Sequence, residues 1–174
     1  YLMDTPDKGD GSLTGYNVWK WIDYDNYNYP YAGAGSPDFS TNWIILRYAE
    51  IYLNDAEARL ETGDVEGARK AVNMIRQRVG LPDLTESDPE KLRELIRKER
   101  RIEFAFEEQR FYDVRRWKIG PETQTTLHGV RFVSPTEFKV TKTDIRTWND
   151  RLYLTPVPHD EIVRSSVLKQ NPGY

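Results

Sequence analysis

The segment that most constrains this chain runs from Lys98 to Lys118 and reads KERRIEFAFEEQRFYDVRRWK. Its glutamates Glu99, Glu103 and Glu107 recur every four residues, so on a helix they share one side. Arginines and aromatic side chains surround them. A solvated helix does not need so much aromatic area, and a nucleic-acid-binding helix would not carry so many acids. The pattern predicts a helix that is buried on most sides, with its charges matched by arginine–carboxylate pairs.

We expect the charged residues of this segment to join others from an earlier helix in one structural ion-pair network. Such groups should be largely buried and paired, because an isolated buried charge is costly. The predicted members are Arg47, Glu50, Glu57, Glu99, Arg100, Glu103, Arg110, Asp113 and Arg116. Facing acids could instead form a general acid/base pair, as in glycosidases. The many nearby guanidinium groups oppose the raised pKa that such a role needs, and so favour the structural interpretation.

Length and composition exclude several classes of function. The 174 residues suffice for one domain spanning residues 1–174, and the net charge of -3 gives no field for nucleic acid. No apolar run is long enough to cross a membrane, and no signal peptide opens the chain. There is no cysteine, and the two histidines, His128 and His159, have no ligand partner at helical spacing. We therefore expect no metal, no cofactor and no catalytic residue.

The chain divides into three zones, of which the middle one, residues 44–119, is helical. Apolar residues at helical spacing predict a first helix over Ile45–Leu60, including Ala49, Leu53 and Ala56. The turn Thr62-Gly63-Asp64 ends it, with glycine at the C-terminal side and aspartate as the N-cap of a second helix. The two form a helix–turn–helix of tetratricopeptide type, which needs neighbours to bury its faces.

A third helix should begin at Asp88, an N-cap residue followed by proline at the first helical position. Its predicted apolar face holds Leu92, Leu95, Ile96, Ile102 and Phe106. We expect a break near residues 108–109, followed by a short helix that ends at Trp117.

The last zone, residues 120–174, is predicted to hold short strands and a C-terminal tail. Gly120-Pro121 breaks the preceding helix. Val130–Val133 and Phe138–Thr143 form a predicted β-hairpin, Leu152–Leu154 is a further strand candidate, and a helical turn should follow over His159–Ser165. The expected class is thus mainly α, with a small hairpin near the C-terminus.

The first zone, residues 1–43, is a long loop region with ten of the 22 aromatic residues and no arginine. Only Gly15–Ile22 alternates well enough to suggest a strand. Aromatic rings stack on the apolar face of a sugar, and the interleaved Asp and Asn side chains can bind its hydroxyls. The candidate ligand-binding residues are Trp19, Trp21, Tyr24, Tyr27, Tyr29 and Tyr31. The alternative is that the tryptophans pack on the helices and the tyrosine hydroxyls fix the loop.

An ordered set of motifs resembles the C-terminal part of the SusD/RagB family. NWIILRYAEIYLNDAEA at 42–58 resembles the family's R-Y-A-E helix, and the ERRIE and RFYDVRRW stretches resemble its E-R-R-x-E … R-x-x-D-x-R-R-W block. The P-x-P strand at 153–158 and the QNPGY end match as well. Glu108 departs from the pattern, because the family often has glycine there; this matters only if Glu108 adopts a left-handed conformation.

The resemblance implies a lipoprotein of the bacterial outer membrane that faces outward and binds nutrients. Such proteins cap a SusC-like TonB-dependent transporter and hand it glycans or peptides, and tetratricopeptide repeats form their scaffold. Membrane contact is implied only through an N-terminal lipid anchor that this chain lacks. The chain is then a fragment of a longer protein that binds an oligosaccharide and has no enzymatic activity.

Two other classes of function stay open. A protein-interaction scaffold would show a large exposed apolar patch on its helices and no aromatic cleft. A glycosidase would show two carboxylates about 5–10 Å apart across an open cleft.

Overall fold

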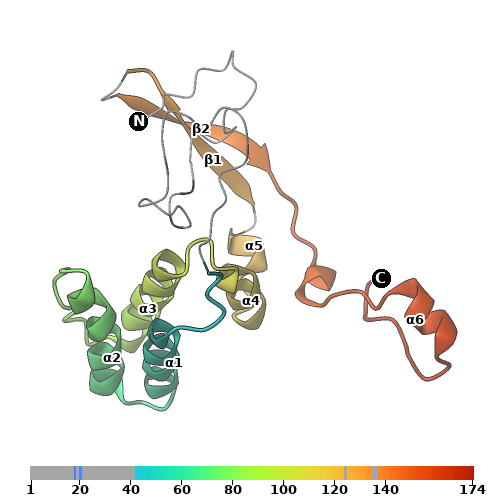
Figure 1. Cartoon of the computed structure of the whole chain (residues 1–174), viewed down its shortest axis with the longest axis horizontal. Coiled ribbons are helices and arrows are strands. Elements are labelled where there is room, and N and C mark those ends of the chain that lie inside the picture. Colours follow the sequence, from blue (N-terminus) through green and yellow to red (C-terminus); the bar gives the residue numbers. More distant parts are fainter. Residues whose placement is uncertain (1–17, 19, 21–41, 124, 135–136) are drawn as a thin grey trace. The chain divides into compact units, whose positions relative to one another are not determined.

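The computed structural model describes residues 18, 20, 42–123, 125–134 and 137–174 (Figure 1). The expected strand over 15–22 and the candidate aromatic residues at 19–31 lie outside this described set, Val18 and Lys20 excepted. Two compact units divide the chain: residues 21–110 form one, and residues 1–20 with 111–174 form the other. The single-domain organisation stays a prediction.

A helical hairpin opens the described part of the 21–110 unit. Helix α1 spans Tyr48–Glu61 and helix α2 spans Val65–Arg78. Gly63 between them has φ +90°, which glycine adopts without strain, and the Asp64 carboxylate accepts a hydrogen bond of 2.8 Å from the Gly67 backbone amide. The predicted turn and cap are therefore confirmed. The predicted start at Ile45 is wrong: that side chain is exposed, because α1 begins only at Tyr48.

Helix α3 spans Pro89–Glu103 and packs beside α1 and α2 (Figure 1). The Asp88 carboxylate accepts a hydrogen bond of 3.0 Å from the Lys91 amide, which confirms the predicted N-cap. The three helices close over an apolar core in which several side chains have no exposed surface: Leu53, Ala56, Ala68, Val72 and Leu92. The alanines at 56 and 68 let the first two helices approach closely.

Two residues of the predicted apolar face of α3 do not reach this core. Ile102 is exposed, since six positions after the buried Ile96 place it about 120° away around the helix. Phe106 is also exposed, because α3 ends at Glu103 and the chain turns before it. Helix α4, Gln109–Arg116, follows this turn and contains the boundary between the two units. The predicted break is thus confirmed, although α3 ends before residue 108.

The other unit holds a short helix and the β-hairpin. Helix α5 spans Gly120–Thr123, so the predicted helix-breaking Gly-Pro in fact opens a helical turn. Strands β1, Thr126–Phe132, and β2, Phe138–Ile145, pair antiparallel with Val130 opposite Val140. The predicted hairpin is confirmed: β1 begins four residues earlier and ends one residue earlier than predicted, and β2 ends two residues later. The mainly helical class with a small hairpin is confirmed with it.

The chain after β2 is irregular, with two short helical turns. The predicted strand at 152–154 is wrong, because Asp150–Tyr153 forms a 3-10 turn, η1, capped by the Asn149 side chain, which accepts a 3.1 Å hydrogen bond from the Arg151 amide. Helix α6, His159–Arg164, confirms the predicted helical turn.

The C-terminal QNPGY residues fold back onto the segment that precedes α6. The Gln170 side-chain amide accepts from the Val157 backbone N–H at 2.8 Å and donates to its carbonyl at 2.9 Å. The Asn171 amide donates to the Thr155 carbonyl at 2.6 Å, and the Tyr174 hydroxyl donates to the Leu154 carbonyl at 3.1 Å. These side chains satisfy backbone groups that a proline-containing segment cannot pair in a sheet.

Gly120 tests how tightly the second unit packs. A Cβ at this position would lie 2.1 Å from Cε2 of Trp148, and the Gly120 amide donates to the Tyr153 hydroxyl at 3.2 Å. We predict that Gly120→Ala lowers the free energy of unfolding by about 1–3 kcal/mol, because the indole must move. Urea denaturation followed by tryptophan fluorescence measures this. Glu122→Ala, at an exposed position of the same helix, is the control, and equal losses for the two variants would contradict the prediction.

Candidate functional site

Arg47, the residue before α1, holds the end of α3 and the turn that follows. Its Nε and Nη2 donate to the two Glu107 carboxylate oxygens at 2.7 and 2.9 Å. Its Nη1 donates to the Glu103 carboxylate, and Nη2 also donates to the Glu103 backbone carbonyl at 2.7 Å. The side chains of Arg47, Glu103 and Glu107 are only 21%, 11% and 6% exposed. We call this group of three residues the Arg47 clamp.

The clamp keeps Arg47 firmly charged. Burial alone lowers the pKa of Arg47, but the hydrogen bonds to Glu107 and Glu103 outweigh burial and raise this pKa above its ordinary value. The guanidinium also lies over the ring of the buried Phe104, with Cζ 4.5 Å from the ring centroid. Arg100 approaches the same ring at 5.2 Å. Both guanidinium groups therefore contact the apolar ring of Phe104.

Further contacts extend the clamp to the other helices. Arg78 of α2 donates to Glu103 at 2.6 Å, and Arg76 donates to the buried Glu99 at 2.7 Å. The buried Arg100 donates to the Asn54 side chain at 2.7 Å and to the Gln109 side chain at 3.4 Å. Gln109 in turn donates to Glu50 at 3.3 Å.

The four remaining predicted members of the network differ in how far they are buried. Glu57 lines a shallow hollow between α1 and α3, and Arg110 is half-buried on α4. Asp113 is buried in the 111–174 unit and accepts a hydrogen bond of 3.0 Å from Arg116. The expectation that Arg116 is itself largely buried is wrong, because it lies at the last position of α4 and its side chain reaches solvent.

Sequence reasoning found the glutamate stripe but misjudged how it is used. Glu107 follows the end of α3, so it does not continue the helical stripe of Glu99 and Glu103. The turn nevertheless returns its carboxylate to the same arginine that binds Glu103. Asn54 and Gln109 were not among the predicted members. A single polar amide residue gives no pattern in the sequence that would have indicated these contacts.

The turn between α3 and α4 is strained. Phe106 and Glu108 both have φ +63°, a left-handed conformation that costs an L-amino acid about 1–2 kcal/mol. Glu108 is therefore a residue for which the family's frequent glycine would be the less strained choice. Arg47 binds Glu103, which precedes Phe106 in the sequence, and Glu107, which follows it. These contacts hold both ends of the turn and so oppose its relaxation.

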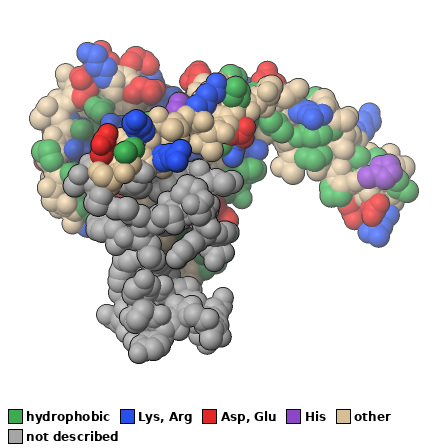
Figure 2. Space-filling view, turned by 90° about the horizontal axis from the view of Figure 1, so that it is seen from above, with side chains coloured by type: hydrophobic (Ala, Val, Ile, Leu, Met, Phe, Trp, Pro, Cys, Tyr) green, Lys and Arg blue, Asp and Glu red, His purple; other side chains and the backbone are tan. Residues whose placement is uncertain are grey.

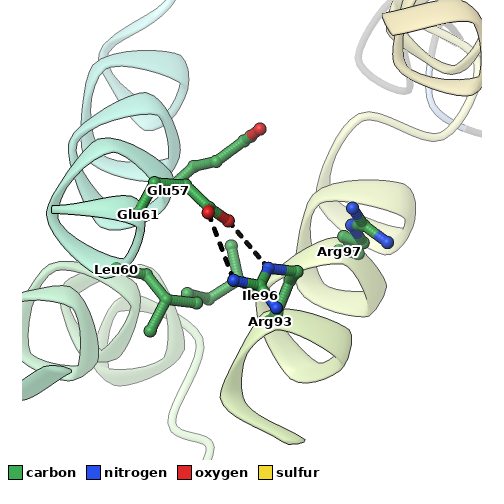
Figure 3. A pocket seen from close by; sticks show the side chains of 6 residues that line it. All are labelled: Glu57, Leu60, Glu61, Arg93, Ile96 and Arg97. Carbon is green, nitrogen blue, oxygen red and sulfur yellow. Dashed lines mark hydrogen bonds and ion pairs between the residues drawn. The ribbon is translucent and has the colours of Figure 1, made fainter. Parts of the chain in front are cut away.

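The hollow near Glu57 is too small to hold a ligand. Glu57, Leu60 and Glu61 come from α1, and Arg93, Ile96 and Arg97 come from α3 (Figure 3). Arg93 donates to the two Glu61 oxygens at 2.7 and 3.1 Å, and this hydrogen bonding lowers the pKa of Glu61. The cavity volume is about 10 Å³, which is about the room of one water molecule and less than any sugar ring needs.

The face in view in Figure 2 shows no strong electrostatic feature, and the described residues contain no metal-binding cluster. Lysine and arginine side chains are interspersed with aspartate and glutamate on the face in view in Figure 2. The described residues hold no group of three or more His, Asp or Glu that could bind a metal ion. Among these residues, no helix is both long and apolar enough to span a membrane.

The described part of the chain is mainly helical with a small two-stranded antiparallel sheet, and known proteins resemble it. The family model described as the SusD family matches residues 2–174. SusD-like protein P2 of Formosa agariphila is 38% identical over 155 residues, covering 82% of this chain and 28% of its own length. SusD-like protein P25 of the same organism is 32% identical over 172 residues, covering 86% and 31%.

A solved structure of a SusD-like protein also resembles this chain. The crystal structure of a SusD-like protein from Bacteroides fragilis is 96% identical and superposes with a TM-score of 0.89, covering 100% of this chain and 33% of its own. The chain therefore belongs to the SusD family. It spans about a third of the length of the relatives named here.

The clamp should contribute strongly to stability. We predict that Arg47→Ala lowers the free energy of unfolding by about 3 kcal/mol, because it leaves Glu103 and Glu107 short of a cation in a mostly buried place. Arg59→Ala is the matched control, since Arg59 also contacts two carboxylates but does so at the surface. The loss at position 59 should be clearly smaller, because exposed ion pairs are screened by solvent and contribute little. Urea denaturation of both variants decides, and a loss at position 47 as small as that at 59 would refute the role of the clamp.

A substitution in the strained turn should stabilise the protein, in contrast to Arg47→Ala. We predict that Glu108→Gly raises the free energy of unfolding by about 0.5–1 kcal/mol, because the relieved strain exceeds the entropy cost of glycine. Lys98→Gly, at an exposed position inside α3, should lower it by about 1 kcal/mol. Thermal melts of the two variants provide the comparison. A destabilised Glu108→Gly variant would show that the side chain, and not the backbone, matters at this position.

Proposed function

We propose that this chain is part of a non-enzymatic nutrient-binding protein that captures a glycan at the cell surface. Membership of the SusD family is the observation that carries the proposal, since the match runs over residues 2–174. Proteins of this family are in general binding proteins that work with a SusC-like TonB-dependent transporter. The chain spans about a third of its relatives' length, so it would supply only part of the whole binding protein.

The ligand contacts would come from the aromatic first zone. Trp19, Trp21, Tyr24, Tyr27, Tyr29 and Tyr31 alternate with short polar residues, a composition suited to stacking on sugar rings and binding their hydroxyls. These six residues lie outside the described part of the chain, although the neighbouring positions 18 and 20 lie within it. The proposal therefore rests on their chemistry and on the family.

The described residues support this assignment by being engaged elsewhere. The carboxylates of Glu99, Glu103 and Glu107 accept hydrogen bonds from arginine side chains that belong to the ion-pair network. Glu57 and Glu61 lie on one helix beside a hollow of about 10 Å³. These acids therefore do not face each other across an open cleft, as a glycosidase pair would.

The location proposed for the whole protein is the outward face of the outer membrane. A lipid anchor at the N-terminus of the longer protein would tether it there, so that this chain itself would need no contact with the bilayer. The transporter partner and the anchor both come from family membership.

A glycan panel tests the proposal. The full-length protein should bind at least one oligosaccharide by calorimetry, and Trp21→Ala should weaken this binding roughly 3- to 10-fold through lost stacking. Tyr112→Ala is the control, because Tyr112 is an exposed aromatic residue of α4 outside the candidate set. Binding of peptides with no response to any sugar would refute the glycan as ligand. Equal losses for the two variants would refute the first-zone site.

A second candidate function is a helical scaffold that binds a partner protein and no small molecule. The observation in its favour is the number of apolar side chains that the helices leave exposed, among them Tyr48, Ile51 and Met74. It predicts that the full-length protein keeps this surface open until a partner chain covers it.

A further inference from the structure

The hairpin formed by β1 and β2 (Figure 1) places basic side chains opposite each other across its two strands. Arg131 of β1 lies directly opposite Lys139 of β2, so both side chains point to the same face, with their Cβ atoms about 4.5–5.5 Å apart. On the other face, Lys142 lies opposite His128. None of the cross-strand pairs in this ladder joins a basic side chain to an acidic one. The hairpin therefore does not neutralise its own cations.

The Arg131–Lys139 pair is open to solvent and has no acidic partner. Both residues are exposed, and neither forms an ion pair within the part of the chain that the structure describes. Asp144, the acid within β2, lies opposite Leu127 instead. In the 21–110 unit, by contrast, several arginines before α1 and on α2 and α3 each bind a carboxylate. The two cations of the hairpin are thus available to an anion from outside the chain.

The arrangement of this pair does not favour folding. Like charges placed directly opposite each other destabilise a sheet. Charged side chains on exposed strands do protect a sheet against edge-to-edge aggregation, but an arginine opposite a glutamate would serve that purpose without the repulsion. The particular property of two adjacent cations is that one anionic group can contact both of them at once.

We propose that Arg131 and Lys139 bind an acidic substituent of a glycan, which is a carboxylate or a sulfate ester. This inference rests on the proposed function, because glycan capture is what brings a polysaccharide to the protein. The planar guanidinium of Arg131 presents donors that match paired anionic oxygens, and the Lys139 ammonium adds a point charge beside it. The hairpin would thus select charged over neutral polysaccharides. Aromatic stacking in the first zone cannot make this choice, because it contacts only the apolar faces of sugar rings.

Matched pairs of oligosaccharides test this selectivity with the full-length protein. Oligogalacturonate is compared with its methyl ester, and a sulfated galactan oligosaccharide with its desulfated form, by calorimetry. We expect the charged member of at least one pair to bind roughly 3- to 10-fold more tightly in about 50 mM salt. The difference should shrink in about 500 mM salt, because exposed charges are screened. The pair that responds distinguishes a carboxylate from a sulfate ester.

Replacing both cations shows whether the hairpin is responsible. The double substitution Arg131→Gln with Lys139→Gln should abolish the preference for the charged oligosaccharide. The matched control, Lys91→Gln with Lys98→Gln, removes two exposed cations from α3 and changes the net charge equally, and it should keep the preference. Thermal melting should show the hairpin variant to be at least as stable as the parent protein, because the contact between like charges is gone.

Several results would overturn the proposal. Equal affinity for the charged and neutral members of both pairs would show that no acidic group is recognised. A preference that survives in the hairpin variant, or that is lost equally in the control, would exclude these two residues as its source. A lower melting temperature of the hairpin variant would show that carboxylates within the longer protein already bind them. Binding of neutral glycans alone would refute this inference and leave the proposed function intact, whereas silence towards every sugar would refute both.

Discussion

The bidentate contact of Arg47 with Glu107, made together with its contact to Glu103, determines where the three helices meet. It joins the residue before α1 to the last residue of α3 and to the turn beyond it. An arginine can do this because its planar guanidinium presents five donors in a fixed arrangement, whereas a lysine ammonium acts as a point charge. The core of Leu53, Val72 and Leu92 supplies the driving force for packing, but its contacts are not directional.

The helices distribute polar and apolar side chains in an unusual way. Charged residues such as Glu99 and Arg100 are buried and bonded, while Tyr48 and Ile51 are left outside. The buried charges are bonded and fix how the helices align, whereas the outer apolar residues contact solvent.

Local features of this fold could be predicted from the sequence, and long-range ones could not. The caps at Asp64 and Asp88 and the turn at Gly63 depend on neighbouring residues, and all three were predicted correctly. The start of α1, the exposure of Ile102 and the 3-10 turn at 150–153 were not, because periodicity gives no sharp helix end and does not say which side faces the core. The pairing of Arg47 with Glu107 spans 60 residues and has no local signature.

Glu103 accepts hydrogen bonds from two arginines that come from different parts of the chain, Arg47 before α1 and Arg78 at the end of α2. The α1–α2 hairpin therefore does not neutralise all of its own charges, since two arginines at its ends share one carboxylate on the next helix. Anyone who transplants this hairpin into another repeat protein would have to carry an acid at the equivalent place on the recipient's following helix. Without such an acid, two guanidinium groups would lie near each other, where the hairpin meets the next helix, with no carboxylate between them.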